Sequence, residues 1–159
     1  MDLLVYFEWM ESSLLGAIGK SYGGVYAIAQ SVHLMSLVVL GGAVLLTDLR
    51  LLNLIMKDVP SETVVNQAHH WFKVALVSIT LTGVFMAAAV ALRLYYNQFF
   101  WAKMLSLFAG VLFVFLVKLP LLSSAPHAEL SPVSVRLVAL ASIAVWFTVA
   151  ATGRWIGFS

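Results

Sequence analysis

The stretch QSVHLMSLVVLGGAVLLTDLRLLNL, residues 30–54, decides how the rest of the chain is interpreted. It is a long apolar run with His33 near its start and the triplet Asp48-Leu49-Arg50 near its end. Polar side chains are costly in hydrocarbon unless they are paired or reach water. We therefore expect His33, Asp48 and Arg50 to contact other parts of a protein or a membrane surface.

The composition of the whole chain is that of an integral membrane protein. Of the 159 residues, 62% are hydrophobic and only 10% are charged, and the mean hydropathy is +1.00. A soluble domain carries about 25% charged residues. The apolar runs are unbroken rather than alternating, which favours helices that cross a lipid bilayer. A net charge of +2 without a basic cluster predicts no nucleic-acid partner, and the lack of cysteine excludes disulfides and thiolate metal sites.

We predict an all-α membrane protein with a single domain over residues 1–159, built as an up-down-up-down bundle of four transmembrane helices. Apolar length and turn residues place these spans at about residues 21–56, 61–96, 99–119 and 131–155. A short amphipathic helix at about residues 2–17 is expected to lie in the membrane interface. No basic segment precedes its apolar residues, so we expect no cleaved signal peptide.

Several motifs occur together along the chain. They are His33 early in the first span, Asp-Leu-Arg-Leu-Leu at 48–52, Thr82-Gly83, Phe100-x-x-Lys103 and Gly153-Arg154. With this set the chain resembles, over nearly its whole length, a family of small bacterial inner-membrane proteins known only as a domain of unknown function. The resemblance implies a multi-pass protein of the bacterial inner membrane and supports His33 as a family feature. His70 stands where members usually have proline, so the resemblance gives no support to a role for His70.

His33 is the first candidate functional residue, because a histidine well inside a membrane helix is a functional hypothesis by default. One stripe of the helix carries Tyr26, Gln30, His33, Leu37, Val44 and Asp48. Such a stripe should face protein rather than lipid. His33 is then a candidate ligand of haem b or copper, or a carrier of a proton. The alternative is a hydrogen bond from its imidazole to a hydroxyl or carbonyl group on a neighbouring helix.

A second haem ligand is harder to find, because membrane b-type cytochromes usually use two histidines at one depth on facing helices. The turn between the first two spans places His33 level with about Phe85, and Met86 is the soft ligand nearest that depth. The second ligand is therefore predicted to be Met86 or a second His33 from a symmetric dimer.

Three other histidines form a second candidate site, for copper or zinc. His69 and His70 lie early in the second span, level with Asp48, and His127 lies in a loop at the same end of the bundle. Neighbouring histidines on a helix point about 100° apart, so His70 with His127 is the better pair of ligands. Asp48 could orient one imidazole. The alternative is that these histidines belong to a polar layer at the interface.

Asp48 and Arg50 are two positions apart, so they point to opposite sides of their helix. We expect each to form a structural clamp with another element. The candidate partners of Asp48 are Lys73, Lys118 and Arg136, and those of Arg50 are Glu129, Glu62 and a lipid phosphate.

The chain offers little soluble mass in which catalysis could occur, so an activity of its own is not expected. The leading functional hypothesis is a small redox-associated subunit that binds haem or a metal through histidine, or that supports a neighbouring subunit that does. The competing hypothesis is a purely structural accessory subunit with no cofactor. Glycine and alanine on the first two spans, including Gly41 and Gly42, allow close helix packing, so other membrane subunits or copies of the chain are the expected partners.

Overall fold

The structure of the protein is a computed structural model, and it describes residues 3–123 and 132–158. Within these residues every element is a helix. Four helical segments are long and apolar enough to cross a membrane: Gly23–Leu51, Ser61–Ala89, Gln98–Leu121 and Val133–Phe158. The prediction of an all-helical chain with four candidate spans is confirmed for this part of the protein.

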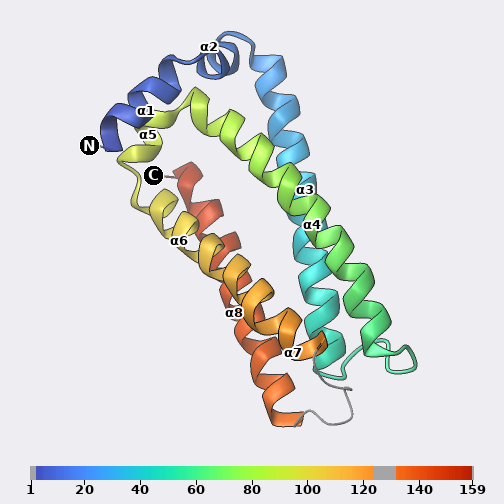
Figure 1. Cartoon of the computed structure of the whole chain (residues 1–159). Helices are drawn as coiled ribbons and strands as arrows, with labels where there is room; N and C mark the ends of the chain where they lie inside the picture. The colour runs from blue at the N-terminus through green and yellow to red at the C-terminus, as the bar shows by residue number, and fades with distance from the viewer. Residues whose placement is uncertain (1–2, 124–131, 159) are drawn as a thin grey trace.

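The N-terminal segment forms two helices, α1 (Leu3–Ser12) and α2 (Leu14–Ser21), where a single helix over residues 2–17 was expected. Ser13 separates them, because its extended backbone ends α1 and its hydroxyl accepts a hydrogen bond from the Gly16 amide at the start of α2. A serine in this position caps a helix N-terminus. Both helices lie across one end of the long helices (Figure 1).

The first span, α3 (Gly23–Leu51), ends five residues before the predicted boundary at Met56. Asn53 and Met56 have positive φ angles of 60° and 49°, which a helix does not allow. Arg50 fastens the loop that follows, since its guanidinium donates hydrogen bonds to the Val59 carbonyl at 3.0 and 2.8 Å. The second span, α4 (Ser61–Ala89), then begins directly after Pro60.

The second span was predicted to continue to Tyr96, but it breaks at Val90, and a short helix, α5 (Ala91–Tyr95), follows. The Glu11 carboxylate explains the break. Its Oε2 accepts a hydrogen bond of 2.6 Å from the Leu92 amide, which in a continuous helix would donate to the carbonyl four residues earlier. The N-terminal helices are thereby joined to the end of α4.

The third span begins as α6 (Gln98–Phe113), widens into a π-helical turn (Val114–Lys118) and ends as α7 (Leu119–Ser123). It was predicted to end at Leu119, before Pro120. A proline ring clashes with the carbonyl four residues earlier in an α-helix. The wide turn moves that carbonyl away, and the Leu119 amide donates to Val114, five residues back. The last span, α8, covers Pro132–Trp155 and ends in a 3₁₀ turn, Ile156–Phe158.

The long helices form two pairs, α3 with α4 and α6 with α8, and α3 also contacts α8 (Figure 1). In Figure 1 the two pairs come together near α7, at the end that also holds the loop 52–60, which we call the loop end. The main core lies between the pairs. It consists of Leu40, Val44, Phe72, Ala75, Ile79, Val114, Trp146 and Val149.

Candidate functional site

Polar side chains interrupt the apolar packing between α3 and α4 midway along the helices. His33, 8% exposed, lies with its Nδ1 atom 2.9 Å from the Thr82 hydroxyl. One turn further along α3, the Ser36 hydroxyl lies 2.7 Å from the Ser78 hydroxyl. His33 lies on the stripe of α3 that was predicted to face protein, and it does contact protein. Gln30 lies on the same stripe but is exposed.

The hydrogen bonds of Thr82 indicate which nitrogen of His33 carries the proton. A threonine hydroxyl has one hydrogen to donate, and Thr82 lies 2.7 Å from the Ser78 carbonyl, an oxygen that can only accept. We infer that Thr82 donates to Ser78 and accepts from Nδ1–H of His33, whose ring also lies within hydrogen-bonding reach of the Ile79 carbonyl. In the neutral imidazole this leaves the lone pair on Nε2, as in a histidine that is prepared to bind a metal ion.

The backbone of α4 fits closely against the His33 ring. A methyl group on Gly83 would lie 3.4 Å from Cε1 of the ring, an ordinary van der Waals distance, so the space between the ring and α4 is no larger than a methyl group. Met86 lies on the same helix, one turn beyond Thr82. A porphyrin between His33 and Met86 would have to separate two helices that touch. The structure therefore does not favour Met86 as the second haem ligand of the same chain.

The second polar site is a buried ion pair near the loop end. The Lys118 ammonium lies 2.5 Å from Oδ1 of Asp48, and the two side chains are 7% and 0% exposed. Both Oδ2 of Asp48 and the nearby hydroxyl of Ser142 on α8 are buried, and the described residues offer neither a hydrogen bond of good geometry. The pair connects α3 to the third span, and Ser142 brings α8 to the same point.

The π-helical turn sets the position of Lys118, which is its last residue. A π turn inserts one extra residue into a helix and changes the direction in which the following side chains point. Such turns frequently occur at functional sites. In this protein the turn lies against Asp48 and is followed directly by Leu119-Pro120, so the local sequence that causes it also delivers the ammonium group to the carboxylate.

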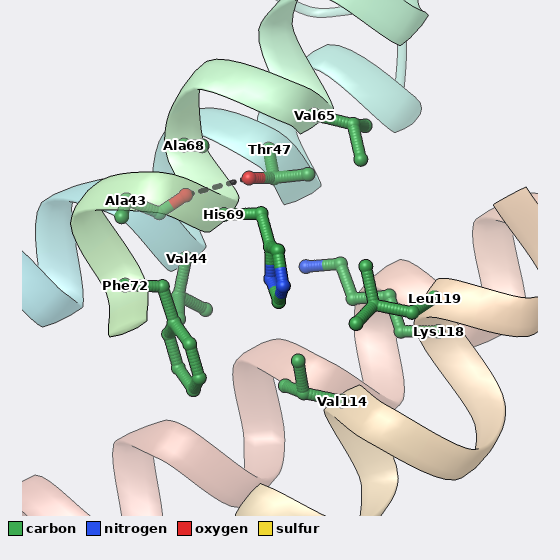
Figure 2. A pocket seen from close by; sticks show the side chains of 10 residues that line it. All are labelled: Ala43, Val44, Thr47, Val65, Ala68, His69, Phe72, Val114, Lys118 and Leu119. Carbon is green, nitrogen blue, oxygen red and sulfur yellow. Dashed lines mark hydrogen bonds between the residues drawn. The ribbon is translucent and has the colours of Figure 1, made fainter. Parts of the chain in front are cut away.

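A cavity of about 30 Å³ adjoins the ion pair. Its walls come from α3, α4 and the third span, and Figure 2 shows the polar side chains Thr47, His69 and Lys118 among the apolar ones that line it. The His69 ring reaches into this space, stacked beside Phe72 with 6.3 Å between ring centroids and edge-on to Phe115 at 5.7 Å. The cavity thus places an imidazole, an ammonium group and a hydroxyl around one small volume.

The sequence of the chain matches the model of one known protein family. A family model described as a family of unknown function, DUF6644, matches residues 6–159. The chain belongs to this family. No curated protein and no solved structure matches it. The resemblance found in the sequence is confirmed as a family of unknown function, and the chemistry of this member must be argued from its own residues.

The histidines proposed as a copper or zinc site are not brought together within the described residues. His69 faces the cavity, whereas His70 is exposed beside Trp71. His127 lies outside the described residues. Among the residues that the structure does describe, no group of three histidine or acidic side chains could hold a metal ion.

Asp48 and Arg50, the predicted clamp residues, differ in whether they contact an expected partner. Asp48 pairs with Lys118, one of its three candidates, while Lys73 and Arg136 lie exposed on α4 and α8. Arg50 was expected to meet Glu62, Glu129 or a lipid phosphate. Among the described residues it instead bonds the backbone carbonyls of Val59 and Lys57, because the loop folds back under the helix end. Glu129 lies outside the described residues.

Three features of the structure were not anticipated from the sequence. The Thr82-Gly83 pair was noted only as a motif, although a hydroxyl beside a glycine is a signal for close packing against a polar side chain. Ser142 gave no signal, because a single serine in an apolar helix resembles any small residue. The contact between Glu11 and Leu92 was also missed, since nothing local to either residue indicates it.

Proposed function

We propose that this protein is a redox-associated subunit of a bacterial inner-membrane complex, in which His33 presents Nε2 to haem iron or copper. Its four spans would cross the bilayer in up-down-up-down order. The observation that carries the proposal is the contact of 2.9 Å between Nδ1 of His33 and the Thr82 hydroxyl. A metal-ligating histidine almost always has its other nitrogen held by such a partner, which fixes the ring orientation and the tautomer.

The close contact between α3 and α4 at His33 restricts how a cofactor could bind. These helices leave no space for a haem between them, so besides His33 the group would be held by another chain, through a second His33 in a symmetric dimer or a residue of a neighbouring subunit. This requirement agrees with the exposed apolar surface of the spans, where Met35, Leu105, Phe108 and Phe147 are each more than half exposed. Such a surface is suited to lipid or to partner helices.

The test is to purify the full-length chain in mild detergent from haem-replete and copper-replete cells. We expect a Soret band or bound copper in the unmodified protein, loss of it in His33→Ala, and weaker binding in Thr82→Val. His70→Ala is the matched control, because His70 is exposed and should leave binding unchanged. Loss of copper only in His70→Ala would instead move the site to His70 and His127. An unmodified protein without haem or metal contradicts the proposal.

A purely structural accessory subunit is the second candidate, and the Asp48–Lys118 pair favours it. A buried ion pair between two helix pairs specifies how they dock, whether or not a cofactor is present. In that case His33 serves only to pair with Thr82. The two candidates are distinguished by cofactor content together with stability: a structural role predicts that His33→Ala destabilises the protein in the absence of any bound haem or metal.

A further inference from the structure

We propose that the cavity beside Asp48 and Lys118 holds water that connects the buried ion pair to His69, so that Asp48 is a proton-binding site in exchange with the loop end of the membrane. This inference does not depend on a cofactor at His33. It starts from the cavity itself. A water molecule needs roughly 10–15 Å³ of such space and two to four polar partners. The cavity measures about 30 Å³.

The polar groups on the cavity wall match the hydrogen bonds of water. Lys118 has three N–H donors, and the described residues accept only one of them, at Oδ1 of Asp48. The Thr47 hydroxyl donates to the Ala43 carbonyl at 2.6 Å, so its oxygen remains free to accept (Figure 2). His69 contributes an imidazole with one donor and one acceptor. Water in the cavity can therefore accept from Lys118 and donate to Thr47 or His69.

The ion pair has an unused site for a proton. Oδ2 of Asp48 is fully buried and has no hydrogen-bond partner among the described residues. An unpaired acceptor in such surroundings is energetically unfavourable. The adjacent Ser142 hydroxyl also lacks a partner of good geometry, and it can donate to the ionised carboxylate or accept from the protonated acid. The native arrangement thus leaves room for a second protonation state.

His69 provides the connection to the aqueous side. It is the ninth residue of α4, so its Cα lies roughly 12 Å along the helix from Ser61 at the loop end. Its ring is partly exposed and also lines the cavity. Imidazole exchanges protons near neutral pH, which makes it the usual carrier between bulk water and a buried group.

The proton balance of the exchange is simple. His69 takes a proton from bulk water and gives it to the cavity water, which passes a proton to Lys118 as Lys118 passes one of its own to Asp48. One proton has then moved from bulk water to Asp48, and Lys118 remains an ammonium group. No covalent bond other than those to hydrogen changes.

The remaining charged groups at this end lie on the surface. Lys73 on α4 is exposed and is near enough to act electrostatically on His69. Arg136 on α8 is exposed as well, and Arg50 on α3 is bound to the loop carbonyls. Asp58 in the loop and Glu62 at the start of α4 are exposed, so Asp48, which reaches the cavity through Lys118, is the buried acidic group described at this end.

Infrared spectroscopy of the full-length protein in lipid nanodiscs tests the proposal. Acidification should produce a carboxylic-acid C=O band that is absent in Asp48→Asn and that shifts promptly when water is replaced by D₂O. In His69→Leu we expect this shift to slow by about tenfold or more, since exchange then requires local opening of the structure. Asp58→Asn is the control, because Asp58 lies exposed in the loop and its loss should leave the band unchanged.

A second variant tests the same water-filled cavity without changing His69, so the result does not depend on the folding of His69→Leu alone. Ala68 also lines the cavity, and Ala68→Val fills part of it while keeping His69. It should slow the D₂O shift in the same way. The proposal is overturned if no band depends on Asp48 over the pH range in which the protein stays folded. It is also overturned if the band shifts as fast in both variants as in the unmodified protein.

Discussion

Asp48 and Lys118 are 70 positions apart in the chain and form an ion pair of 2.5 Å in which neither side chain reaches the surface. The carboxylate comes from the last turn of the α-helix α3, whereas the ammonium group comes from a π-helical turn. Two charges removed from water must be paired well to offset the cost of their desolvation. The π-helical turn therefore ends on the ammonium group that pairs with the buried carboxylate.

Removing either member of this pair should be more damaging than removing both. We expect Asp48→Leu or Lys118→Met alone to lower the free energy of unfolding by about 3–5 kcal/mol, because each leaves an uncompensated buried charge. The double substitution should recover most of that loss, since it leaves apolar side chains in its place. Chemical denaturation in detergent, arranged as a double-mutant cycle, measures the difference.

Lys73→Met is the control for this cycle, because Lys73 is an exposed lysine of α4 at the same end of the bundle. It should leave the stability within about 0.5 kcal/mol of the unmodified protein. Equal losses in both single variants and a larger, additive loss in the double variant would show that the two charges do not interact.

Two glycines of α2 allow this helix to lie directly against the end of α4. A methyl group on Gly19 would lie 2.7 Å from Cβ of Ala89, and one on Gly16 would lie 2.9 Å from the Ala88 carbonyl oxygen. We expect Gly19→Ala and Gly16→Ala each to displace α2 and to increase hydrogen exchange in residues 14–21. Gly23 and Gly24 have nothing within 4 Å of the same added atom, so Gly23→Ala and Gly24→Ala are matched controls. Similar exchange in all four variants would argue against close packing.

The contacts of Glu11 with Lys20 and with the Leu92 amide should be sensitive to acid. Hydrogen bonds from Lys20 and from the Leu92 amide hold the pKa of Glu11 below its ordinary value. A lowered pKa in the folded state contributes stability that is present above the unfolded-state pKa and is lost as the pH falls through the folded-state pKa. Hydrogen exchange in residues 3–12 should therefore rise below about pH 4.

The variant Glu11→Gln should show raised exchange in residues 3–12 at neutral pH and little further change in acid. Glu8→Gln, which alters an exposed carboxylate on the same helix, should behave as the unmodified protein does. If Glu8→Gln removes the acid response instead, the contact between Glu11 and α5 is not its cause.

The candidate spans could be predicted from the sequence because hydrocarbon imposes one requirement, a long apolar helix, and the chain satisfies it four times. The residues at which the helices end were harder to predict from the sequence. The first span ended early because Asn53 and Met56 adopt positive φ, which neither residue type requires. The second span broke at Val90 because the Leu92 amide donates its hydrogen to the carboxylate of Glu11, 81 positions earlier in the chain. Such contacts depend on the folded chain and leave no local pattern.

The candidate site was predictable to a similar extent. A charged residue inside an apolar run must find a partner, so a basic contact for Asp48 followed from its position alone. The choice of Lys118 over Lys73 or Arg136 depended on the π-helical turn, for which Pro120 was the visible signal. The role of Thr82 could not be derived, because the rotation of α4 about its axis decides which of its residues faces His33.

The hydrogen bond between His33 and Thr82 fixes the tautomer of the His33 imidazole. With Thr82 donating to the Ser78 carbonyl, Nδ1 of His33 must carry the hydrogen that Thr82 accepts. Nitrogen NMR of histidine-labelled protein should show a neutral Nδ1–H imidazole at position 33, identified by the loss of its signals in His33→Ala. Thr82→Ser keeps the hydroxyl and should preserve that tautomer. Thr82→Val keeps the shape but removes the acceptor, so it should shift the tautomer population and lower the free energy of unfolding by about 1–3 kcal/mol, the cost of a buried unpaired donor. An Nε2–H tautomer in the unmodified protein would mean that Thr82 donates to His33, and it would remove the free lone pair on Nε2 on which ligand binding at His33 depends.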